Sequence, residues 1–249
     1  MTNDHSKIVD ALPVVRASGE GAPEAPVDSD RTSPRPLSDE DSALALLQRH
    51  DLSPDVIEKL SKSGVTSKSR KVMLAVISHQ KSPRYVSLSL MRKLFTFDLM
   101  LVALTPAVAG DLKMAAEELL INRLESISAG EKLSLAHRAS GRVAGELLLD
   151  SEPRVIAAAL QNARLTEAPV VKAVLANKAS PALAQAVCEH VNWSLRREVR
   201  IALLRSEHTS PEHAFEFAKS LPNDVVKETL QNSRLPETLK LRLMKDDED

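Results

Sequence analysis

Short amphipathic segments that follow one another without interruption constrain the fold of this chain more than any other feature. From residue 38 onward, runs of about ten to fourteen residues show helical apolar spacing, and two to four polar residues separate each run from the next. Ser-Pro opens several of them, at Ser53, Ser82, Ser180 and Ser210. A serine hydroxyl accepts a hydrogen bond from a free helix amide, and proline at the first helical position loses only an amide without a partner.

The pattern predicts an all-α fold. Residues 85–91 alternate like a strand, but the Ser82-Pro83 start and the helical neighbours favour a helix there. The expected helices are 38–49, 54–63, 68–79, 83–94, 97–104, 107–123, 129–139, 141–150, 152–162, 167–177, 181–191, 195–206, 211–221, 224–232 and a short closing helix at 236–245.

The composition agrees with a helical fold. Aromatic residues make up 2% of the chain and there are 7 glycines, fewer of both than most β architectures use. Hydrophobic residues still reach 43%, so the core must be built on Leu, Val, Ile and Ala. The longest apolar run, 99–110, is too short to span a bilayer and contains Pro106. We expect it to form a buried central helix; the alternative is an exposed groove for a partner helix.

The helical segments are similar to one another. Five aligned lines show this, and their helices end at the aligned residues His79, Asn122, Asn162, Ser206 and Asn232. The lines are VMLAVISHQKSP (72–83), AAEELLINRLES (115–126), VIAAALQNARLT (155–166), VRIALLRSEHTS (199–210) and VVKETLQNSRLP (225–236). Units of this kind bury their apolar faces by stacking end to end. Asparagine tolerates the left-handed conformation that closes a helix, which is the role expected at these ends.

With these lines, the chain resembles bacterial α-solenoids of the HEAT and leucine-rich-repeat-variant type, most closely over residues 160–222. The resemblance implies a right-handed α-α superhelical solenoid over 38–249 that serves as a protein-binding scaffold. A minority of HEAT-like solenoids bind nucleic acid. Residues 1–37 are rich in proline and small polar residues, which predicts a disordered N-terminal arm. Within it, the patch from Ile8 to Val15 is either a docking motif or incidental.

A basic stretch is the first candidate binding feature. The net charge is −1, yet no Asp or Glu occurs from Lys59 to Phe97. A surface formed by this stretch would attract phosphates or an acidic protein. The alternative is that these side chains face water or pair with acids of adjacent repeats such as Glu117 and Glu118. The candidate residues are Lys68, Arg70, Lys71, Lys81, Arg84, Arg92 and Lys93.

A second candidate surrounds the single tryptophan. Arg196 and Arg200 are four residues apart, so in a helix at 195–206 they share a face beside Trp193. Trp and Arg dominate interaction hot spots. In the alternative interpretation, Trp193 caps the core at a turn and the arginines pair locally.

Patterns typical of enzymes are weak in this sequence. Cys188 and His190 are two apart and point in different directions on a helix, so Cys188 is interpreted as a small buried residue. The histidines around His208 lack a metal-ligand spacing. Gly141 and Gly145 form a Gly-x-x-x-Gly, which carries little meaning outside a membrane segment. We therefore expect no catalytic residues, no cofactor and no metal.

The sequence thus predicts a non-enzymatic, protein-interaction scaffold whose partner has an acidic surface. The alternative is a nucleic-acid-binding HEAT-like protein that uses residues 59–97. A lone cysteine and the lack of an apolar leader at the start predict a cytoplasmic protein without a membrane span. The oligomeric state is not predicted.

Overall fold

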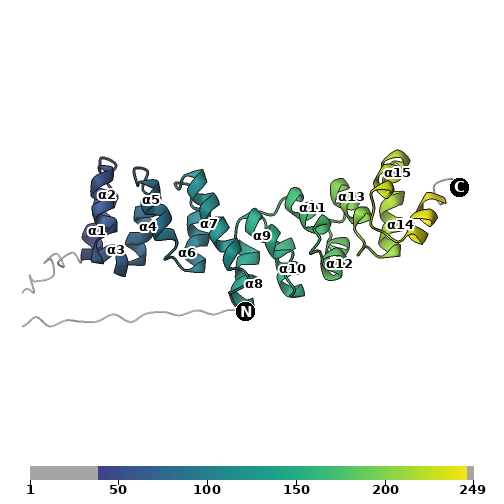
Figure 1. Ribbon diagram of the computed structural model, residues 1–249, viewed down its shortest axis with the longest axis horizontal. Helices are drawn as coiled ribbons and strands as arrows, with labels where there is room; N and C mark the ends of the chain where they lie inside the picture. Colours follow the sequence, from purple (N-terminus) through teal and green to yellow (C-terminus); the bar gives the residue numbers. More distant parts are fainter. Residues whose placement is uncertain (1–38, 246–249) are drawn as a thin grey trace, which may run out of the picture. The chain divides into compact units, whose positions relative to one another are not determined.

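A computed structural model describes residues 39–245 (Figure 1). The described part contains sixteen α-helices and no strand. The helices are α1 Asp39–Leu47, α2 Pro54–Ser61, α3 Gly64–Lys68, α4 Arg70–Ser78, α5 Arg84–Met91, α6 Thr96–Leu104, α7 Gly110–Arg123, α8 Ala129–Arg138, α9 Gly141–Leu147, α10 Pro153–Leu160, α11 Glu167–Leu175, α12 Pro181–Glu189, α13 Arg197–Arg205, α14 Pro211–Lys219, α15 Asn223–Gln231 and α16 Glu237–Lys245.

The all-α prediction is confirmed for this part of the chain, including a helix at the alternating residues 85–91. One helix was missed. In α3, the Ser63 hydroxyl accepts a hydrogen bond from the Thr66 amide and starts a helix of five residues. The expected arm at 1–37, with its patch from Ile8 to Val15, lies outside the described residues.

Serine caps open several helices, as predicted, but not all. The hydroxyls of Ser180 and Ser210 accept hydrogen bonds from amides in the first turns of α12 and α14. Ser53 takes the N-cap position of α2 without a side-chain bond. At Ser82 the prediction is wrong, because Pro83 occupies the N-cap and α5 begins at Arg84. Proline as N-cap leaves these first amides without a side-chain acceptor.

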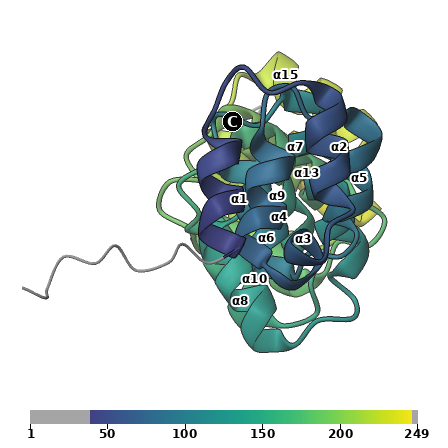
Figure 2. The same ribbon diagram turned by 90° about the vertical axis from the view of Figure 1, so that its left-hand side faces the viewer.

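The helices pack in two rows. Each main contact joins helices that are at most three places apart in the chain. One row contains α2, α5, α7, α9, α11, α13 and α15, and each of these helices contacts the next. Most helices of the other row, which begins α1, α4 and α6, also contact their successors. Within residues 39–245 the helices follow chain order (Figure 1), and the end view separates α1 from α2 and α5 (Figure 2).

The core between the rows is aliphatic, as the composition predicts. Its fully buried side chains are mostly Leu, Ile, Val and Ala, with Phe217 the aromatic exception. The apolar run at 99–110 is buried on one side only. In α6, Leu99 and Val102 are buried while Leu101 is 50% exposed, and the helix ends at Leu104, two residues before Pro106. None of the described helices is both long enough and apolar enough to cross a membrane.

The aligned residues at the helix ends act differently from our prediction. His79, Ser206 and Asn232 have φ values of −72°, −84° and −104°, so none of them is left-handed. Asn122 lies inside α7. The left-handed interpretation is wrong for these four positions, and the fifth, Asn162, shows what its side chain does instead.

The Asn162 side chain connects one helical unit to the preceding one. It is 4% exposed, and its Nδ2 donates to the carbonyls of Ala136 and Ala139 at 2.7 and 3.1 Å. Its Oδ1 accepts from the amide of Arg164 at 2.8 Å. These bonds satisfy carbonyls at the C-terminal end of α8, which have no partner within their own helix.

The same arrangement recurs with other side chains. The Ser233 hydroxyl donates to the carbonyl of Leu204 and accepts from the amide of Leu235. His79 Nε2 lies 3.1 Å from the carbonyl of Arg49, and Nδ1 accepts from the amide of Lys81. A polar side chain after one helix therefore binds a carbonyl at the end of an earlier helix. Among the aligned residues this bond explains His79 and Asn162, and Ser233 lies next to the aligned Asn232. It does not explain Asn122, Ser206 or Asn232, whose side chains bind no carbonyl of an earlier described helix.

Candidate functional site

The candidate basic residues lie at both ends of α4. Lys68, Arg70 and Lys71 surround its start, whereas Lys81 and Arg84 follow its end. Arg92 and Lys93 lie after α5, in the turn that leads into α6. All seven side chains belong to exposed residues. Because α4 separates the first group from the second, the stretch is distributed over two ends of a helix.

Three of the seven pair with acids of neighbouring helices. Arg70 binds Asp98, whose side chain is fully buried at the start of α6. Lys71 lies 3.8 Å from Glu40. Arg84 forms an ion pair with Asp111 in α7.

The remaining four lack a close carboxylate among the described residues. They are Lys68, Lys81, Arg92 and Lys93. The hydrogen bond from Arg49 is the main cause that lowers the pKa of Asp51, and the charge of Lys81 lowers this pKa further without a direct contact. Three of the basic side chains thus pair with acids of other helices, as in the alternative interpretation, but Glu117 and Glu118, the acids named for it, face Arg142 in α9 instead.

Trp193 belongs to the core. Its ring is buried, and Nε1 donates to the carbonyl of Leu160 at 2.9 Å. Arg196 lies over this ring at 5.8 Å from its centroid, whereas Arg200 lies over Phe217 at 5.7 Å. Arg196 is the N-cap of α13 rather than part of it, so the expected shared helix face is wrong. The structure does not bring the two arginines together on one ring.

Two apolar side chains beside Trp193 were missed by the sequence reasoning. Val191 and Leu195 are 77% and 67% exposed in the turn between α12 and α13. In this turn the Trp193 side chain is buried, whereas the side chains of Val191 and Leu195 point to solvent. Helical apolar spacing could not predict their exposure, because the turn is not helical.

Gly141 and Gly145 determine how closely α9 packs against α11 and the turn that precedes it. A Cβ on Gly141 would lie 2.2 Å from the carbonyl oxygen of Arg164, and one on Gly145 would lie 2.7 Å from the Cβ of Pro169. Both distances are impossible for real atoms, so only glycine permits this approach. The Gly-x-x-x-Gly spacing was therefore a valid packing signal outside a membrane.

The close approach of α9 and α11 forms the floor of a groove. A hollow of about 700 Å³ lies between these helices, with Leu149, Ala168, Pro169 and Ala173 among its lining residues. A second hollow of about 250 Å³ lies at the ends of α11, α13 and α15. Ala176 lines both hollows, so they lie next to each other. We call the two hollows together the cationic groove.

Positive side chains exceed negative ones in the cationic groove. Its lining holds five Arg and Lys side chains, Arg142, Arg164, Lys172, Arg205 and Arg234, against two carboxylates, Glu146 and Glu207. Lys172 pairs with Glu146 at 2.9 Å, and Arg142 pairs with Glu117 and Glu118.

Three arginines of the groove face no carboxylate of the described chain. Arg164 donates only to the carbonyl of Arg138, at 3.4 Å. Arg234 donates to the amide oxygen of Asn177 at 3.1 Å. The Nε of Arg205 is buried and has no hydrogen-bond partner. A buried donor without an acceptor is costly, which makes Arg205 the most unusual polar group of the groove.

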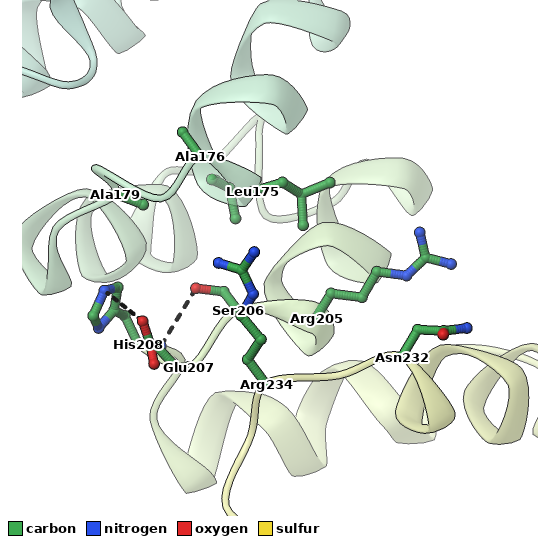
Figure 3. Close-up of a pocket in the computed structure, with 10 residues that line it drawn as sticks. Leu175, Ala176, Ala179, Arg205, Ser206, Glu207, His208, Asn232 and Arg234 are labelled. Carbon is green, nitrogen blue, oxygen red and sulfur yellow. Dashed lines mark hydrogen bonds and ion pairs between the residues drawn. The ribbon is translucent and has the colours of Figure 1, made fainter.

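Figure 3 shows the smaller hollow. The Arg234 guanidinium points between Leu175 and Ser206, and the Arg205 side chain extends past Asn232. His208 lies 3.8 Å from Glu207, so this carboxylate faces the imidazole. The hollow therefore offers guanidinium donors beside a small apolar wall formed by Leu175, Ala176 and Ala179.

The single cysteine is not poised for nucleophilic chemistry. Burial raises the pKa of the Cys188 thiol to about 12, with Glu189 and Glu216 adding to the shift, so the thiol is protonated at neutral pH. The thiolate is the nucleophilic form. Within residues 39–245, no group of three or more His, Cys, Asp or Glu is arranged to hold a metal ion.

Comparison with known proteins adds no relative. A scan of protein-family models finds none that matches the chain, and searches of curated proteins and of solved structures find no match either.

Proposed function

We propose that this chain is a non-enzymatic scaffold that holds a protein partner with an acidic surface. The observation that carries the proposal is the cationic groove, in which Arg164, Arg205 and Arg234 face no carboxylate of the described chain. Carboxylates of a partner supply the acceptors that planar guanidinium groups bind best.

The packing supports a scaffold role. Two rows of helices with contacts between chain neighbours are what stacked helical repeats produce, and we propose that they form an α-α superhelical solenoid of the HEAT type. Bonds such as those of Asn162 hold successive units in register. Stacked repeats present one continuous surface made from the ends of many helices, which suits the binding of an extended partner.

The groove favours a protein over nucleic acid as the partner. Nucleic acid would need a track of free cations, but Arg70, Lys71 and Arg84 of the basic stretch are already paired with acids. The stretch is also divided between two ends of α4. Nucleic-acid binding by residues 59–97 is therefore the alternative function, and the experiment below distinguishes it from protein binding. We place the protein in the cytoplasm, because its lone cysteine requires no oxidising compartment.

The test is affinity purification of the tagged full chain from its native cells, with and without nuclease treatment. The proposal predicts a protein retained in near-stoichiometric amount after nuclease treatment and released by salt, because charge pairs at a surface are screened. The Arg205→Ala/Arg234→Ala variant should retain much less of this protein. The matched control is Arg154→Ala/Lys227→Ala, which removes two exposed cations outside the groove. Retention of nucleic acid alone, or of no protein, contradicts the proposal.

A further inference from the structure

We infer that the cationic groove binds a short extended peptide segment in which an apolar residue is followed or preceded by Asp or Glu residues. The apolar side chain occupies the hollow between α9 and α11, and the carboxylates bind Arg205 and Arg234 beyond Ala176. This inference rests on the proposed scaffold function and names the kind of partner segment that the groove accepts.

Arg205 provides the first argument. Arginines near helix ends elsewhere in the chain are used structurally: Arg123 donates to the carbonyls of Leu94 and Arg92, and Arg164 to that of Arg138. Arg205, the last residue of α13, makes no such bond, and its Nε is buried without an acceptor. An internal capping role therefore explains Arg123 and Arg164 but not Arg205.

Arg234 provides the second argument. Its backbone amide donates to the backbone carbonyl of Arg205, so the backbones of these two residues lie side by side in the fold. Its side chain uses one terminal nitrogen for Asn177 and leaves its other donors directed into the hollow (Figure 3). The side-chain amide of Asn232, which also lines the hollow, has no hydrogen-bond partner within residues 39–245. The Arg234 guanidinium and the Asn232 amide thus offer donors at the smaller hollow, and the Arg205 guanidinium, which extends past Asn232, offers separate ones, so each arginine can bind a carboxylate of its own.

The larger hollow provides the apolar half of the site. Its floor is made of small side chains and glycine, because α9 and α11 approach at Gly141 and Gly145. Small floor residues leave about 700 Å³ above them, within the range of pockets that bury a ligand's apolar groups. Its rim cations Arg142 and Lys172 are already neutralised by acids, and its third cation, Arg164, donates to the carbonyl of Arg138, so this half of the groove selects mainly by shape.

The two halves together favour an extended peptide. The hollows lie on either side of Ala176 and are lined by residues of α9, α11, α13 and α15 or of the turns at their ends, so a ligand that fills both must reach several successive helices. A free carboxylate or another small anion would fill the smaller hollow and leave the larger one empty. An extended chain projects alternate side chains and can fill both.

The test uses a phage-displayed library of random 12-residue peptides, panned against the immobilised full chain at low salt. We expect enrichment of sequences with two or more Asp or Glu next to Leu, Ile, Val or Phe. Fluorescein-labelled copies of the enriched peptides are then titrated by fluorescence anisotropy. The Arg205→Ala/Arg234→Ala variant should bind them at least tenfold more weakly, and the Arg154→Ala/Lys227→Ala control should bind them like the unchanged chain.

A second variant tests the apolar half independently of charge. Ala168 is exposed and lines the larger hollow, so Ala168→Trp fills this space without disturbing the core. It should also weaken the peptides at least tenfold, with unchanged far-UV circular dichroism. Enrichment without acidic residues, equal binding by all variants, or no enrichment overturns the inference. If native purification yields a protein partner but the peptides bind the groove variants as tightly as the unchanged chain, only the peptide inference fails. If purification yields no protein partner, the proposed function fails as well.

Discussion

Asn162→Ala should destabilise the protein by far more than a typical asparagine substitution. The side chain makes three hydrogen bonds, to the carbonyls of Ala136 and Ala139 and from the amide of Arg164. It is 4% exposed, so water cannot replace these partners. At about 1 kcal/mol for each bond, the expected loss is about 3 kcal/mol. For a folded region of this size, the loss lowers Tm by about 6–12 °C.

The assay is thermal and urea unfolding followed by far-UV circular dichroism. Asn122→Ala is the matched control, because Asn122 occupies the aligned position in another repeat but is exposed and has no side-chain bond. Alanine is the better helix former, so this control should keep or slightly raise Tm. If Asn162→Ala unfolds within about 0.5 kcal/mol of the unchanged chain, or like the control, the inter-unit bonds do not hold the repeats together.

The remaining predictions concern packing, the tryptophan and the thiol. Gly145→Ala should destabilise by about 1–3 kcal/mol because its Cβ would meet Pro169, whereas Gly130→Ala in α8, with open space around it, should be neutral or stabilising; urea midpoints that coincide would refute the close approach. Trp193→Phe removes the donor to the buried Leu160 carbonyl and should cost about 1–3 kcal/mol in the same assay, and an unchanged midpoint would contradict this bond. Cys188 should resist Ellman's reagent at pH 8 until urea unfolds the chain. Its raised pKa means that the folded state holds a proton which the unfolded state loses above about pH 9, so stability should fall from there toward pH 12; rapid labelling of the folded chain would contradict the burial.

The sequence predicted the helices well because they depend on local signals. Apolar spacing and serine starts located every expected segment, and α3 was missed because five residues around Gly64 contain too little periodicity to separate a helix from a turn. The starts at Ser53 and Ser82 show the limit of the same signal. The residue types mark where a helix begins, but the backbone decides whether the hydroxyl reaches an amide.

Features that depend on contacts between helices could not be predicted in this way. The alignment detected Asn162, but its role became visible only once α8 lay beside it. The Gly-x-x-x-Gly spacing at Gly141 and Gly145 marks a close approach, but only the position of the turn before α11 and of Pro169 shows what approaches. The basic stretch suggested a charged surface, yet its partners Glu40, Asp98 and Asp111 come from outside the stretch. The cationic groove could not be predicted because its four arginines are far apart in the chain, although Arg164 and Arg234 occupy the same position of the aligned lines 155–166 and 225–236.

Hydrogen exchange measured by mass spectrometry, on the full chain alone and with its purified protein partner, tests the central claim most directly. The account predicts that the partner slows amide exchange at the ends of α11, α13 and α15, in residues 172–179, 204–208 and 231–235, and that this protection disappears in the Arg205→Ala/Arg234→Ala variant. Protection confined to residues 59–97, or no protection along the groove, would contradict the claim that the cationic groove holds the partner.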